Sequence, residues 1–129
     1  MPNVKPVGIY REMYRKRPAH LPLLAESYTT RDIEDRSKII EYMRLGEPVF
    51  DVLEDVVDVV DGKEWIRSGP SLISDGEWLW RVDSIYYLSN YALDIPDDFL
   101  EHVRSQDYRP SSDIDVSDES FDAAISAYF

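Results

Sequence analysis

The sequence predicts a single α+β domain that is mostly helical, with one αα-hairpin and one short β-hairpin. Apolar residues recur at helical spacing through much of residues 29–61 and again near the C-terminus. Only the stretch SLISDGEWLW, residues 71–80, carries a clear hairpin pattern. The 129 residues, 43% of them hydrophobic and 12% aromatic, have the length and composition of one folded domain, 1–129.

The first expected helix spans residues 29–45. It follows an irregular N-terminal segment, residues 1–28, in which four prolines interrupt any regular pattern. Thr29 and Asp32 resemble the start of a capping box, and the apolar positions that follow keep to one face. Gly46 is expected to take the left-handed conformation that ends a helix.

The second expected helix spans residues 47–61 and would pack against the first as an αα-hairpin. Pro48 would lie in its first turn, where proline is tolerated. The valine-rich run could also form a strand, but strict alternation is absent, so the helical period decides. On this helix six carboxylates, with no basic residue among them, would share one third of the circumference. This acidic ridge consists of Glu47, Asp51, Glu54, Asp55, Asp58 and Asp61.

The β-hairpin is expected within residues 71–80, with Asp75 and Gly76 as the two central residues of a type I′ turn. A short helix through Tyr91 would follow, capped by Asp83 or Ser84.

Two more helices are expected in the remainder of the chain. One begins at Pro96, with two aspartates in its first turn, where the helix dipole favours them. A polar linker, residues 105–116, then leads to a C-terminal helix capped by Ser117.

The bulk charge limits the classes of partner. Twenty-six acidic residues against 14 basic ones give a net charge of −12 and disfavour binding to nucleic acid or to an anionic membrane. There is no cysteine, no stretch long enough to span a membrane and no signal-peptide pattern at the N-terminus. We therefore expect a cytoplasmic protein with no nucleic-acid or membrane partner.

No convincing catalytic or metal-binding set is visible. Two histidines, His20 and His102, are too few for most triads or histidine metal sites, and we expect both to be structural. Residues 113–124 begin like a calcium loop but lack its glycine and its final glutamate. Asp75 and Glu77 could be an acid–base pair, which leaves a small carboxylate-dependent hydrolase as a less favoured alternative. We predict no enzyme, no catalytic residue, no metal and no cofactor.

Five aromatic residues cluster between residues 78 and 91. We expect them to form part of the core, although an exposed aromatic patch would be an alternative binding surface. They are Trp78, Trp80, Tyr86, Tyr87 and Tyr91.

Residues 72–99 resemble a stretch of small, acidic, mostly actinobacterial proteins with the pattern L-x-T/S-D-G-x-W-x-W-x-x-D-L-x-Y-Y-V-x-x-Y-x-V-x-L-P-x-x-F. Those proteins look like immunity proteins of polymorphic toxin systems, and the resemblance implies a partner that is a toxin of the same cell. It carries over no functional residue. The matching residues are Leu72, Ser74, Asp75, Gly76, Trp78, Trp80, Asp83, Tyr86, Tyr87, Tyr91, Leu93, Pro96 and Phe99.

These observations favour a non-enzymatic, acidic protein-binding module, an immunity-type inhibitor that occludes a basic toxin such as a nuclease. The acidic ridge would meet lysine and arginine side chains of the partner. Repulsion among its carboxylates is more understandable if a cationic partner relieves it. If the ridge is a surface, replacing Asp51, Asp55 and Asp58 by lysine should leave the protein folded. A nucleic-acid mimic or regulatory adaptor is the alternative.

Overall fold

The computed structural model describes residues 4–111 and 113–129. Residues 1–3 of the expected N-terminal segment and residue 112 of the expected linker lie outside the described residues.

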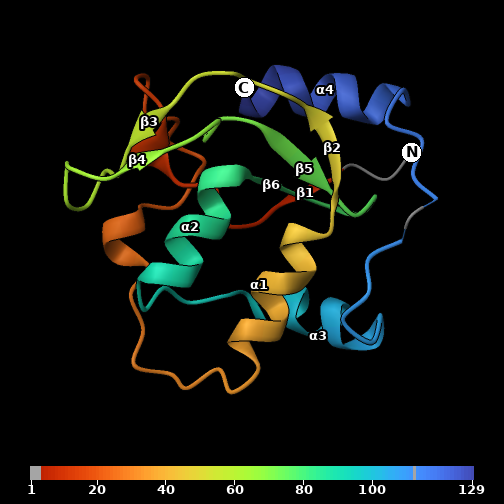
Figure 1. Ribbon diagram of the computed structural model, residues 1–129, viewed down its shortest axis with the longest axis horizontal. Helices are drawn as coiled ribbons and strands as arrows, with labels where there is room; N and C mark the ends of the chain where they lie inside the picture. The colour runs from red at the N-terminus through yellow and green to blue at the C-terminus, as the bar shows by residue number, and fades with distance from the viewer. Residues whose placement is uncertain (1–3, 112) are drawn as a thin grey trace.

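A four-stranded mixed sheet forms the centre of the molecule, with strand order β1-β6-β5-β2 (Figure 1). β1 runs parallel to β6, whereas β5 pairs antiparallel with both β6 and β2. A separate antiparallel pair, β3 and β4, lies outside this sheet. The strands are β1 (Lys5–Pro6), β2 (Glu47–Phe50), β3 (Val56–Val57), β4 (Trp65–Ile66), β5 (Leu72–Ser74) and β6 (Trp78–Arg81).

Helices cover both faces of the sheet. Ile73 and its cross-strand neighbour Trp80 face α1, α2 and α3, whereas Leu72 and Leu79 face α4 and the N-terminal segment. This alternation follows from the two-residue period of a strand. The helices are α1 (Arg36–Arg44), α2 (Val82–Asn90), α3 (Asp97–Ser105) and α4 (Glu119–Tyr128), with 3-10 turns at Arg11–Met13 and Leu24–Glu26.

The predicted aromatic core is confirmed for three of its five members. Trp78, Trp80 and Tyr87 are buried, while Tyr86 and Tyr91 are half-buried. The indole N–H of Trp80 donates to the Met43 carbonyl at 3.0 Å, so the last turn of α1 is joined to the centre of the sheet.

The prediction of a mostly helical fold with an αα-hairpin is wrong, because residues 47–61 do not form a helix. They form β2, an extended segment, β3 and a turn. β-Branched valines favour extended backbone, and pairing of β2 with β5 fixes the start of the segment there. The strand reading of the valine run, set aside for lack of alternation, is the correct one for Val56 and Val57.

Gly46 ends α1 by a different mechanism from the expected one. Its φ is not positive, but a Cβ atom at this position would lie 2.6 Å from Cγ2 of Ile73 and 2.7 Å from Cζ2 of Trp80. Glycine therefore lets the chain pass close to the sheet and enter it directly as an edge strand.

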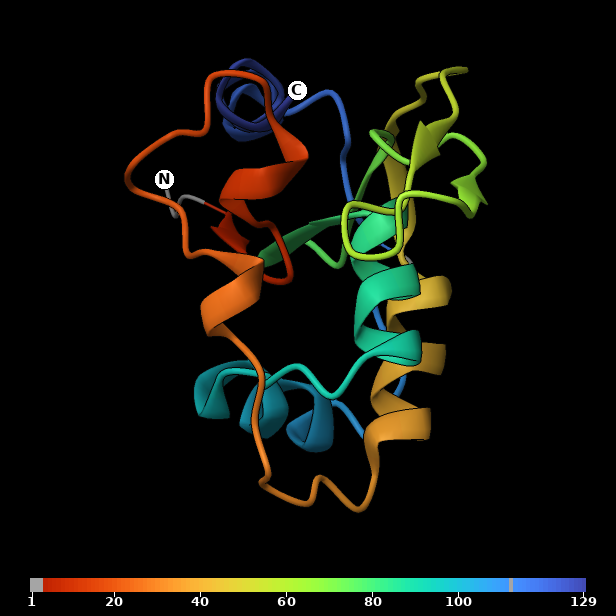
Figure 2. The ribbon, with the colours of Figure 1, turned by 90° about the vertical axis from the view of Figure 1, so that its left-hand side faces the viewer.

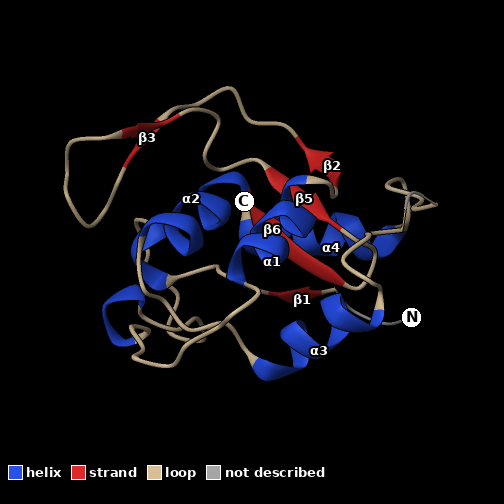
Figure 3. Ribbon diagram, turned by 60° about the horizontal axis from the view of Figure 1, so that its bottom comes forward, coloured by secondary structure: helices blue, strands red, loops and turns tan. Residues whose placement is uncertain are grey.

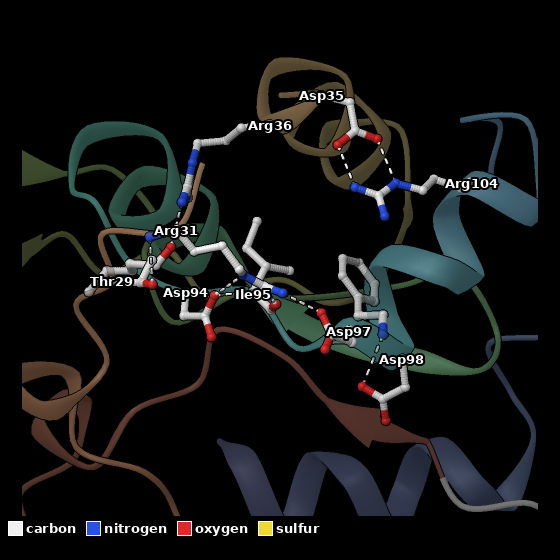
Figure 4. Close-up of polar contacts among 11 residues, drawn as sticks. Thr29, Arg31, Asp35, Arg36, Asp94, Ile95, Asp97, Asp98 and Arg104 are labelled. Carbon is white, nitrogen blue, oxygen red and sulfur yellow. Dashed lines mark hydrogen bonds and ion pairs between the residues drawn. The ribbon is translucent and has the colours of Figure 1, made fainter. Parts of the chain in front are cut away.

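The start of α1 was predicted seven residues too early. Arg31 pairs with Asp94 and Asp97 and donates to the Ile95 carbonyl at 2.7 Å, which holds the chain before α1 against the segment that leads into α3 (Figure 4). Thr29 accepts only a local hydrogen bond from the Arg31 N–H, and the helix begins at Arg36.

The expected β-hairpin and the three expected later helices are present. In the hairpin, Gly76 and Glu77 form the two-residue loop, one position later than predicted, and Gly76 has φ +100°. α2 and α3 begin close to their predicted positions, and Asp118 rather than Ser117 caps α4.

Candidate functional site

Residues 51–67 form a flap that extends beyond α2, away from the central sheet (Figures 2 and 3). Its only regular structure is the β3–β4 pair, in which Val56 is opposite Ile66 and Val57 is opposite Trp65. Val56 and Ile66 pack against the main core, so Val57 and Trp65 occupy the outer face.

Asp58 anchors the flap to the body of the protein. Its carboxylate is completely buried and accepts the hydroxyl protons of Tyr86 at 2.7 Å and Tyr91 at 2.5 Å. The same carboxylate accepts the backbone N–H groups of Val60 and Asp61 at 2.6 and 3.2 Å. The flap turn is thus tied to the aromatic side chains of α2 and of its C-terminal cap.

These hydrogen bonds set the ionisation of Asp58. Burial alone would raise the pKa of its carboxyl, but the two tyrosine hydroxyls and two backbone N–H groups outweigh burial and lower the pKa below its ordinary value. Asp58 is therefore a buried, fully engaged anion.

The structure separates the six residues of the predicted acidic ridge. Asp51, Glu54, Asp55 and Asp61 are exposed on the flap, whereas half-buried Glu47 lies in β2 and Asp58 is buried. Two of the exposed carboxylates also shape the flap, since Asp55 accepts the Ser68 N–H and Asp61 accepts the N–H groups of Lys63 and Glu64. Four of the six thus share one surface segment, but not as a helical stripe.

The flap also exposes apolar side chains, three of which a helix over residues 47–61 was expected to bury: Leu53, Val59 and Val60. Trp65 is 69% exposed and Leu53 is 96% exposed, and Val59 and Val60 are exposed at the turn. A usable signal was present for Trp65: the preceding Gly62-Lys-Glu is a turn pattern that would place Trp65 on a second strand.

A second polar cluster lies around His102 of α3. Its Nε2 is 2.7 Å from Oδ2 of Asp75, and its Nδ1 is 3.0 Å from Oε2 of the exposed Glu77. The Tyr42 hydroxyl donates to the same Asp75 oxygen at 2.5 Å, and burial followed by this bond raises the pKa of Tyr42. These residues border a cavity of about 460 Å³, which residues 113–118 and the start of α4 also line.

The hydrogen bonds of this cluster connect three elements of the fold. Besides Tyr42 and His102, buried Asp75 accepts the backbone N–H groups of Glu77 and Trp78 at 3.0 and 2.7 Å. Three donors and one ring nitrogen of His102 thus surround a single carboxylate. Asp75 therefore joins the β5–β6 turn to α1 and α3.

Several arginines are engaged inside the molecule. Arg31 pairs with Asp94 and Asp97, and Arg104 forms two hydrogen bonds of 2.8 Å with Asp35 (Figure 4). The hydrogen bonds from Arg104 hold the pKa of Asp35 well below its ordinary value, against the effect of burial. The Tyr108 hydroxyl lowers this pKa further, by a smaller amount.

The buried Arg81 pairs with Asp83 through two bonds of 2.9 Å and stacks on the Tyr14 ring. The ion pairs of Arg31, Arg81 and Arg104 therefore all join parts of the protein body. None of them involves a carboxylate of the flap.

Comparison of the chain with known protein families, curated proteins and solved structures gives no match. Within residues 4–111 and 113–129, no helix is long and apolar enough to cross a membrane. Over the same described residues, no group of three or more histidine, aspartate or glutamate side chains is arranged to hold a metal ion.

Proposed function

We propose that this protein is a non-enzymatic binding module that uses its acidic flap to engage a basic protein. The observation that supports the proposal is the placement of Asp51, Glu54, Asp55 and Asp61, all exposed, on one projecting segment. Residues 51–67 hold six acidic residues against Lys63 and Arg67. Such a segment attracts a cationic partner over a distance and repels competing acidic surfaces.

The internal engagement of Asp58 sharpens the set of contact residues. The Asp58 carboxylate is buried and already accepts four hydrogen bonds, so a partner cannot reach it. The proposed contacts are therefore the exposed carboxylates of the flap. An immunity-type inhibitor of a basic toxin is the specific form of the proposal, and it rests on the resemblance of residues 72–99. The nucleic-acid mimic and the hydrolase stay as predictions from the sequence alone.

The proposal is tested with the double variant Asp51→Lys/Glu54→Lys. Both side chains are exposed, and their replacement leaves the hydrogen bonds of Asp55, Asp58 and Asp61 in place. We expect a basic protein captured from native lysate by the wild type to associate at a rate that falls steeply with salt, because screening weakens electrostatic steering. The double variant should lower that rate by about tenfold or more at low salt.

The matched control is Asp32→Lys/Glu34→Lys, a second exposed acidic pair, which lies before α1 and outside the flap. A captured partner that binds the flap variant as fast as the wild type, or whose association does not respond to salt, would contradict the proposal.

A further inference from the structure

The apolar outer face of the flap is exposed at Trp65 and half-buried at Val57. Trp65 and Val57 face outward as a cross-strand pair, and Val59 and Val60 are exposed at the adjoining turn. These four residues are called the apolar face of the flap. A tryptophan that is 69% exposed is unusual in a protein that buries Trp78 and Trp80 almost completely.

The flap holds this face in a fixed position. Val56 and Ile66 pack inward, Asp58 binds two tyrosine hydroxyls, and the Val59 N–H donates to the Tyr87 hydroxyl at 2.9 Å. A rigid presentation reduces the entropy lost when a side chain enters a partner. The backbone behind the apolar face is therefore tied to α2, to its C-terminal cap and to the core.

Charge decides which occupant fits this face. A second copy of a chain with net charge −12 would bring like charges together, and an anionic membrane would repel the same carboxylates. A cationic surface is attracted by them. An apolar depression in that surface would remove Trp65 from water.

We infer that the apolar face of the flap is the anchor of an interface with a basic protein, whose lysine and arginine side chains surround an apolar depression that receives Trp65. This inference rests on the proposed function and adds the chemistry of the contact: the carboxylates bring the partner in, and Trp65 holds it. Trp65 and the exposed carboxylates thus act on different steps, dissociation and association respectively.

Two synthetic peptides of equal length and equal charge test the inference, one alternating lysine with leucine and the other alternating lysine with serine. Titration calorimetry of the wild type should show that the lysine–leucine peptide binds about tenfold more tightly. Trp65→Ser should remove this preference and keep the salt-dependent binding of both peptides. Leu45→Ser is the matched control, because Leu45 is 62% exposed at the end of α1 and outside the flap.

The outcomes separate the two proposals. A wild type without preference for the lysine–leucine peptide, or a Trp65→Ser variant that keeps the preference, overturns the anchor and leaves the acidic function standing. Binding of both peptides that is unchanged in Asp51→Lys/Glu54→Lys, or absent in the wild type, contradicts the proposed function as well. Circular dichroism of each variant establishes that it is folded.

Discussion

Asp58 shows how one side chain can decide what a charged segment does. By sequence it is one of six similar carboxylates, yet it is the one that is buried and accepts four hydrogen bonds. Lysine at this position would place an ammonium group among donors with no acceptor left for them. Asp58→Lys should therefore destabilise the fold, unlike Asp51→Lys at an exposed position.

Asp58→Asn should destabilise the protein in a pH-dependent way. The lowered pKa of Asp58 means that its ionised form contributes stability above its ordinary value of 3.8 and loses that contribution as pH falls through the lower folded value. We expect urea unfolding at about pH 7 to show a loss of about 1–3 kcal/mol. Near pH 3 the difference from the wild type should shrink.

Asp51→Asn is the control for this variant, because Asp51 is exposed, and it should change the free energy of unfolding by less than about 0.5 kcal/mol at either pH. An equal loss for Asp58→Asn at both pH values would show that its charge has no part in holding the flap.

At the scale of elements, local signals predicted the second half of the chain well and its middle poorly. The Asp-Gly signal of the β5–β6 loop (one position early), the dipole-favoured aspartates of α3 and the apolar spacing of α4 act over a few residues, so the local sequence is enough to predict them. Residues 47–61 depend on β5 and on Tyr86 and Tyr91, which lie far along the chain. The pattern of apolar residues within 47–61 contains no information about these distant partners.

Gly46→Ala tests the reason why an edge strand follows α1. The added methyl group would meet Ile73 and Trp80 well inside contact distance, and overpacking of this kind costs about 1–3 kcal/mol. We expect a lower melting temperature and an altered near-ultraviolet circular dichroism signal from Trp80.

Gly62→Ala provides the comparison for that variant. It has φ +67° but no neighbour within 4 Å of its Cβ position, so it should lose about 1 kcal/mol without disturbing the tryptophan signal. A Gly46→Ala variant as stable as the wild type would contradict this explanation, because Ile73 and Trp80 would then have moved to admit the methyl group at no cost.

The candidate site was predictable in part. Composition showed the concentration of acid between residues 47 and 61, and four of those residues are exposed as a binding surface requires. Which carboxylate turns inward depends on the tyrosines of a different element, and the exposure of Trp65 depends on the register of β3 with β4. Both are tertiary properties. A helical projection of residues 47–61 places Asp58 on the surface and does not extend to Trp65.

On the scale of the whole molecule, net charge should govern stability as well as association. A charge of −12 on a small domain repels itself, and salt screens that repulsion. We expect sodium chloride to raise the melting temperature by about 2–5 °C between low and high ionic strength. Potassium chloride should act equally.

The variant Asp51→Lys/Glu54→Lys, with its net charge reduced from −12 to −8, should respond less to salt than the wild type. A melting temperature that falls with salt would contradict this expectation. It would mean that the ion pairs of Arg31 and Arg104, which salt weakens, contribute more to stability than the repulsion among the carboxylates costs.

The two faces of the β3–β4 pair serve separate purposes. Val56, Asp58 and Ile66 point inward and hold the flap, whereas half-buried Val57 and exposed Trp65 point outward. The outward residues can therefore change identity without loss of the fold, as the variable loops of an antibody do on their framework. One scaffold of this kind could acquire new partners by substitution on a single hairpin, while the buried side chains behind it stay the same.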